Sequence, residues 1–93
     1  MPITLAKHIR IPEDVMVSQV EDEIVLLNLE SEQYFALDDI GARIWELLSE
    51  YGNTDIVVDQ ITSEYDVEAD IFRNDLSNLL VDLQRAGLIS VLE

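Results

Sequence analysis

The fold of this chain is decided where the period of its apolar residues changes, within Gln33-Tyr34-Phe35-Ala36-Leu37-Asp38-Asp39-Ile40-Gly41-Ala42-Arg43-Ile44-Trp45-Glu46-Leu47-Leu48. The part from Gln33 to Leu37 is short and aromatic, which favours a strand. From Asp38 the apolar residues recur at the spacing of one helical face, at Ile40, Ile44, Leu47, Leu48 and Tyr51. Asp38 is a suitable N-cap, and Gly52 lies where a left-handed residue ends a helix. The stretch therefore predicts a strand that leads directly into a helix.

Two further strands are predicted before this stretch. Residues 15–20 are rich in β-branched side chains, and residues 24–29 form an almost continuous apolar run. The acidic segment Glu21-Asp22-Glu23 separates them and indicates a hairpin, while Glu30-Ser31-Glu32 is a short polar loop. A three-stranded antiparallel meander results. The lead-in around Pro12 has no predicted element.

Two further helices are predicted after it. Thr54 can cap a second helix, whose apolar face is Val57, Ile61 and Tyr65. Acidic residues at the start of a third helix, predicted from Glu68 to Ala86, complement its dipole. Stepping 100° per residue places Phe72, Leu76, Leu79, Leu83 and Ala86 in one core-facing arc, with Leu80 at its edge beside Arg73 and Gln84. Gly87 ends this helix, a Schellman motif would fold Leu88 back onto Leu83, and residues 89–92 can form a short extended tail.

These elements predict one α+β domain over residues 1–93, with a three-stranded antiparallel sheet followed by three helices. A chain of 93 residues is too short for two cores. The order of elements also matches a winged helix-turn-helix outline, in which the last helix of some proteins enters the major groove of DNA.

The charge of the chain argues against DNA as its partner. Twenty Asp and Glu against five Lys and Arg give a net charge of -15, which opposes contacts with phosphates and with anionic lipid. The predicted third helix itself carries Asp70, Asp75 and Asp82. No run of residues approaches the roughly 18 apolar residues of a membrane helix, and no signal peptide is evident. We expect a cytoplasmic protein that binds neither nucleic acid nor membranes.

Residues for catalysis, metals or cofactors are scarce. The chain has no cysteine, a single histidine (His8) and only three glycines, which leaves no thiolate site, no Cys-His pair and no glycine-rich phosphate loop. Its carboxylates are typical of a solvated surface and of helix caps. We expect no catalytic residue, no metal site and no cofactor, and a small hydrolase is the weakest candidate function.

One feature that indicates binding is the edge of the predicted sheet. The strand Gln33 to Leu37 contains no lysine, proline or inward-facing charge, which are the usual protections of an open edge. A partner peptide could add there as a further strand. The alternatives are that a helix covers this edge, or that Tyr34 and Phe35 are ordinary core aromatics.

A family resemblance favours the peptide. From about Val15 to Ile89 the chain resembles the PqqD-like family, the precursor-peptide recognition elements of ribosomally made, post-translationally modified peptides. The resemblance rests on apolar and glycine positions, namely Tyr34-Phe35-Ala36-Leu37-Asp38, Gly41-Ala42-Arg43-Ile44-Trp45, Leu47-Leu48, Gly52, Ile61, Tyr65-Asp66-Val67, Asp75-Leu76, Leu79-Leu80, Leu83 and Gly87-Leu88-Ile89. The strand followed by Ile-Trp-x-Leu-Leu is more similar to free-standing members from lasso-peptide clusters than to those of pyrroloquinoline quinone synthesis. Asp39 after Asp38 is more acidic than the common pattern of the family.

The resemblance implies that a leader peptide adds beside the third strand and lies against the third helix. By position, the backbone of Gln33, Tyr34, Phe35, Ala36 and Leu37 would pair with the peptide, and the side chains of Arg73, Leu76, Leu80 and Gln84 would line the groove. It implies a non-catalytic adaptor that presents the leader to a leader peptidase and a cyclase. The alternatives are a peptide carrier that works with a radical SAM enzyme in quinone-cofactor synthesis and, in another class, a winged-helix transcriptional regulator.

Overall fold

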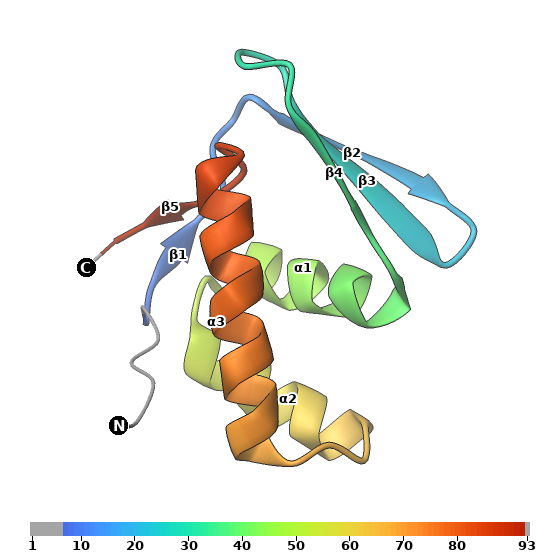
Figure 1. The fold of residues 1–93 in the computed structure, drawn as a ribbon, viewed down its shortest axis with the longest axis vertical. Helices are drawn as coiled ribbons and strands as arrows, with labels where there is room; N and C mark the ends of the chain where they lie inside the picture. The colour runs from blue at the N-terminus through green and yellow to red at the C-terminus, as the bar shows by residue number, and fades with distance from the viewer. Residues whose placement is uncertain (1–6, 93) are drawn as a thin grey trace.

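The computed structural model describes residues 7–92 and contains the predicted sheet and helices in the predicted order (Figure 1). An antiparallel sheet in the order β2-β3-β4 is formed by β2 (Val15–Val20), β3 (Glu23–Asn28) and β4 (Tyr34–Leu37). The helices that follow are α1 (Asp39–Tyr51), α2 (Thr54–Glu64) and α3 (Ala69–Arg85). The predicted α+β class, with a three-stranded meander before three helices, is confirmed.

A small second sheet accounts for part of the unassigned lead-in. Strand β1 (Ile9–Arg10) pairs antiparallel with β5 (Ser90–Val91), which is the predicted extended tail. Ile9 is buried, and its backbone N–H donates to the carbonyl of Gly52 at 2.9 Å. The two ends of the described chain are thus held together beside the end of α1.

The helix ends follow the predicted capping with one exception. Asp38 Oδ1 accepts a hydrogen bond from the Gly41 N–H at 2.8 Å, and Gly52, at φ 61°, donates from its N–H to the Leu48 carbonyl. The prediction that Thr54 caps α2 is wrong, because Asn53 takes that position and accepts from Ile56 N–H at 3.1 Å. Asn53 is extended, as an N-cap residue must be, whereas Thr54 is already helical and buried.

The core lies between one face of the sheet and the three helices. Alternate residues of β3 and β4, including Leu26 and Leu37, are buried on this face. The least exposed side chains opposite them include Leu47, Ile61 and Leu83. The sheet therefore presents one face to the helices and the other to solvent.

Asn28 is a buried polar residue that connects the β3–β4 turn to the end of α3. Its Oδ1 accepts from the N–H groups of Glu30 (2.8 Å) and Ser31 (3.0 Å), and its Nδ2 donates to the carbonyl of Gly87 at 2.6 Å. Gly87 has a φ of 73°, and the Leu88 N–H donates to the Leu83 carbonyl, as a Schellman motif requires. A Cβ on Gly87 would lie 2.8 Å from Asn28 Nδ2, so this close approach also requires glycine.

We predict that Asn28→Asp destabilises the protein by about 2 kcal/mol at neutral pH, because the buried amide donor is replaced by an anion that faces the Gly87 carbonyl. The folded state would raise the pKa of the new carboxyl, since only its protonated form can donate. The difference in unfolding free energy between Asn28→Asp and the parent protein should therefore become smaller as the pH falls. Urea unfolding at neutral and mildly acidic pH measures this, with exposed Asn78→Asp as the matched control. Equal stability of the two variants at neutral pH would contradict the prediction.

Candidate functional site

Strand β4 forms an edge of the three-stranded sheet, and within residues 7–92 no other strand pairs with its outer side. Beyond this edge, α3 faces β4 across a cavity rather than covering it. Tyr34 is 74% exposed, so it is not a core aromatic, whereas Phe35 is half-buried and packs against the core. The edge is therefore available to a further strand.

The register of the sheet determines which backbone groups of β4 point outward. Asn28 N–H donates to the Gln33 carbonyl at 2.8 Å, and the aligned pairs continue as Leu27 with Tyr34 and Leu26 with Phe35. Because hydrogen-bonded and non-hydrogen-bonded pairs alternate in an antiparallel ladder, Phe35 and Leu37 direct their backbone groups to β3. The backbone N–H and C=O groups of Tyr34 and Ala36 consequently face the open edge.

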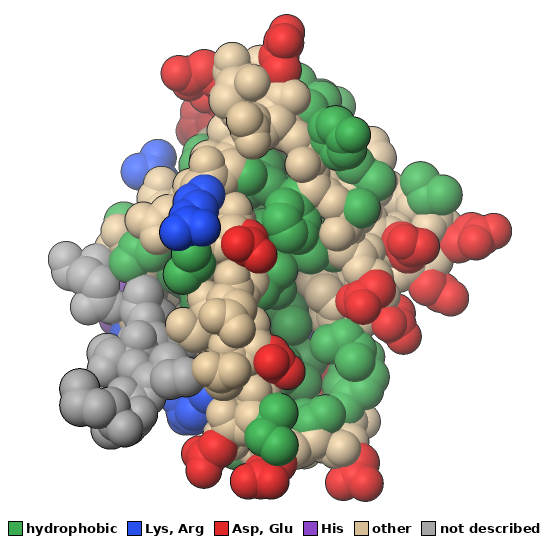
Figure 2. Space-filling model, viewed as in Figure 1, with side chains coloured by type: hydrophobic (Ala, Val, Ile, Leu, Met, Phe, Trp, Pro, Cys, Tyr) green, Lys and Arg blue, Asp and Glu red, His purple; other side chains and the backbone are tan. Residues whose placement is uncertain are grey.

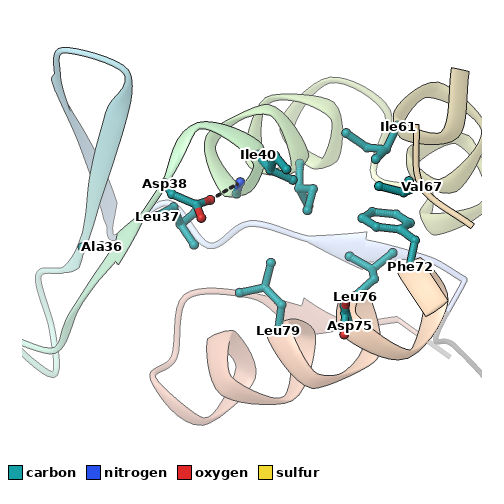
Figure 3. Close-up of a pocket in the computed structure, with 12 residues that line it drawn as sticks. Ala36, Leu37, Asp38, Ile40, Ile61, Val67, Phe72, Asp75, Leu76 and Leu79 are labelled. Carbon is teal, nitrogen blue, oxygen red and sulfur yellow. Dashed lines mark hydrogen bonds between the residues drawn. The ribbon is translucent and has the colours of Figure 1, made fainter. Parts of the chain in front are cut away.

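A cavity of about 360 Å³ lies next to this edge, where β4 leads into α1. Figure 3 shows side chains from β4, the three helices and the α2–α3 loop pointing toward one another around it. The residues that line it are Ala36, Leu37, Asp38, Ile40, Gly41, Ile44, Ile61, Val67, Phe72, Asp75, Leu76 and Leu79. Ten of these twelve carry no charge, so the cavity suits an apolar side chain.

The base of the cavity is formed by buried side chains, and its rim is partly exposed. Leu37, Ile61 and Leu76 belong to the buried core. Val67 and Leu79 retain exposure at the rim. Gly41 brings α1 close to the strand, because a Cβ there would lie 3.0 Å from Leu37 Cβ. Figure 2 shows the result as an apolar strip between α3 and β4, with acidic side chains beside it.

Arg43, which does not line the cavity, connects α1 to the end of α2. Its Nε and one terminal nitrogen donate to the two carboxylate oxygens of Glu64 at 2.9 and 2.6 Å, and its other terminal nitrogen contacts Glu46. The hydrogen bond from Arg43 lowers the pKa of Glu64 below its usual value. The Arg43 cation is thus engaged by two carboxylates.

Three of the nine predicted site residues line the cavity, namely Ala36, Leu37 and Leu76. Tyr34 and Phe35 lie on the same strand, and Gln33 directly precedes it, with its carbonyl bound to Asn28. The predicted backbone segment is therefore brought together at one edge. Its pairing with a peptide stays a prediction.

Arg73, Leu80 and Gln84, which were expected in the groove, do not line this cavity, and their contact with a peptide stays a prediction. Leu80 is only 5% exposed and belongs to the core, and Arg73 lies 3.8 Å from Asp55 at the start of α2. Gln84 is exposed and does not line the cavity. The buried side of α3 is centred near Leu76 and includes Leu80. The cavity borders this buried side at Asp75 and Leu79, whereas the sequence predicted a groove at its other border, beside Arg73 and Gln84.

The sequence prediction missed nine of the twelve lining residues, and two of these nine lie on the edge of α3 opposite to the one expected. Asp75 and Leu79 are spaced four apart and share one side of α3. Leu79 was assigned to the core and instead stands partly exposed in the cavity wall. A helical-wheel projection of the sequence shows that Asp75 and Leu79 share one side of α3, but it does not show which side of the helix faces β4.

The described residues contain neither a candidate metal centre nor a candidate membrane span. Within residues 7–92, no three His, Asp or Glu side chains are grouped so that they could hold a metal ion. No helix of the described chain is long and apolar enough to cross a membrane.

Comparisons with known proteins relate this fold to leader-peptide complexes. The model of a family described as coenzyme PQQ synthesis protein D (PqqD) matches residues 23–89. A solved structure of TbiB1 in complex with the TbiA(beta) leader peptide has a TM-score of 0.84 and 36% sequence identity, covering 90% of this chain and 98% of that one. A structure of lasso peptide synthetase B1 complexed with the leader peptide has a TM-score of 0.79 and 29% identity, covering 89% and 98%. Among curated proteins, no match was found.

Proposed function

The chain belongs to the PqqD family, and we propose from this that it binds the leader region of a ribosomally synthesised precursor peptide in lasso-peptide maturation without itself catalysing a reaction. The observation that carries the proposal is the open edge of β4 beside an apolar cavity. The similarity to two structures that hold leader peptides supports the binding of a leader.

In the proposed complex the leader extends the sheet as a strand beside β4. The outward N–H and C=O groups of Tyr34 and Ala36 pair with the backbone of the peptide. Successive peptide side chains alternate between the two faces of the sheet, so one set points toward α3. An apolar side chain of this set fills the cavity between Leu37, Leu76 and Leu79. Backbone pairing then provides affinity, and the cavity provides selectivity.

The proposed role of binding is to deliver the precursor to a leader peptidase and a cyclase in the cytoplasm. A precursor held by its leader meets an enzyme bound nearby at an effective concentration that can reach the millimolar range. The alternative within the family is a carrier that works with a radical SAM enzyme in pyrroloquinoline quinone synthesis. A DNA-binding role is disfavoured because α3 carries Asp70, Asp75 and Asp82 on a chain of net charge -15.

Titration with the precursor peptide encoded beside this chain's gene tests the proposal. We expect saturable binding of its N-terminal leader region, with amide shifts in β4 and on the Asp75–Leu79 side of α3. The C-terminal core region and a labelled DNA duplex serve as negative controls. Binding of the core region alone, or leader binding that leaves β4 and α3 unshifted, would contradict the proposed function or its site.

A further inference from the structure

The cavity beside β4 has an apolar base and a rim whose charged residues are all acidic. Asp38 and Asp75 are its two charged residues, and among the residues that the structure describes no lysine, arginine or histidine lines it. Exposed Asp66 and Glu68 flank Val67, which also lines the cavity. Charges of one sign around an apolar hollow reinforce one another in attracting a counter-charge.

The basic side chains that could neutralise this rim are engaged elsewhere. Arg43 is held by Glu64 and Glu46 and does not line the cavity. Arg73, although on the same helix as Asp75, is directed to Asp55. The chain has only five Lys and Arg residues. The third one on these helices, Arg85, is in the last turn of α3, ten residues after Asp75, and does not line the cavity.

Of the two acids that line the cavity, Asp75 is the one available for a ligand. Asp38 Oδ1 already accepts the N–H of Gly41 as a helix cap. The carboxylate of Asp75, in contrast, is exposed and makes no hydrogen bond or ion pair within residues 7–92. A peptide strand that fills the cavity would remove water from this carboxylate, which is costly for an anion unless the peptide supplies a cation or donor.

We propose that the peptide this cavity takes carries a cation beside the apolar side chain that fills it, and that Asp75 selects for that cation. This inference rests on the proposed function and adds the chemical class of the ligand. The cation is a lysine or arginine side chain, or the ammonium group of a peptide N-terminus. A peptide with Asp or Glu at this position is rejected by repulsion from Asp75 and the acidic rim.

Selection from an mRNA-displayed library of random 16-residue peptides tests this without a known ligand. We expect peptides enriched on the parent protein to carry Lys or Arg at a fixed spacing from an apolar residue. Selection on Asp75→Asn should lose this preference, whereas selection on Asp70→Asn should keep it. Asp70 is a matched control because it lies on α3, carries the same charge and does not line the cavity.

One enriched peptide, resynthesised in four forms, then gives the quantitative test. Lys→Gln in the peptide should weaken binding to the parent protein about three- to tenfold and binding to Asp75→Asn less than twofold. The N-terminally acetylated forms, with and without Lys→Gln, distinguish a lysine side chain from the peptide N-terminus as the cation. If acetylation weakens binding and Lys→Gln does not, the N-terminal ammonium is the cation.

The outcomes separate this inference from the proposed function. Enriched peptides with an apolar anchor and no basic preference would overturn the role of Asp75 and leave peptide binding intact. Enriched peptides that bind Ala36→Pro as tightly as the parent protein would instead refute strand addition at β4.

Discussion

Replacing Ala36 with proline is expected to weaken leader binding by about 2 kcal/mol, or about thirtyfold, while the protein stays folded. The register places the Ala36 N–H on the open edge of β4, so proline removes a donor that the bound peptide needs and leaves a peptide carbonyl unpaired. The added ring is compatible with an edge strand at such a position. Isothermal titration with the cognate leader measures the change.

Two control variants distinguish loss of a hydrogen bond from damage to the sheet. Val17→Pro makes the same change on the opposite edge of the sheet, because the backbone N–H of Val17 on β2 also points away from β3. This variant should bind the leader with unchanged affinity. Phe35→Pro should instead reduce stability, because the backbone of Phe35 faces β3. If Ala36→Pro binds the leader as tightly as Val17→Pro does, strand addition at β4 is refuted.

Truncation of two neighbouring leucines on α3 is expected to separate binding from stability. Leu79→Ala removes part of the cavity wall and should weaken leader binding by about 1 to 2 kcal/mol, with a smaller loss of stability because the side chain is partly exposed. Leu80→Ala removes a side chain that is 5% exposed and should destabilise the protein by about 2 to 5 kcal/mol. The fraction of Leu80→Ala that remains folded should bind the leader normally.

Urea unfolding and leader titration of both variants, at a temperature where Leu80→Ala is mostly folded, measure these two effects. Leu76→Ala is less informative, because Leu76 is both part of the cavity lining and 1% exposed. If folded Leu80→Ala loses more affinity for the leader than Leu79→Ala does, the peptide binds on the Arg73, Leu80 and Gln84 side of α3, as the sequence predicted.

Local sequence determined the elements of this protein. The change of apolar period at Asp38, the glycines at positions 52 and 87, and the acidic turn at residues 21–22 each act over a few residues, so the meander, the helices and most of their ends could be predicted without tertiary contacts. The lack of protecting residues in Gln33 to Leu37 likewise agreed with the position of β4 at an open edge, although β2 forms a second open edge of the same sheet.

Tertiary structure alone decided how α3 meets that edge. Leu79 and Leu80 differ by 100° on the helix and are equally apolar, so only the docking of α3 against the other helices determines that Leu80 is buried and Leu79 faces the cavity. The same rotation directs Arg73 to Asp55 and leaves Asp75 at the cavity without a partner among residues 7–92. The sheet register decides that Ala36, rather than Phe35, presents its N–H to a peptide. Such choices depend on long-range packing that no short stretch of sequence contains, whereas the elements depend on backbone preferences that each stretch expresses by itself.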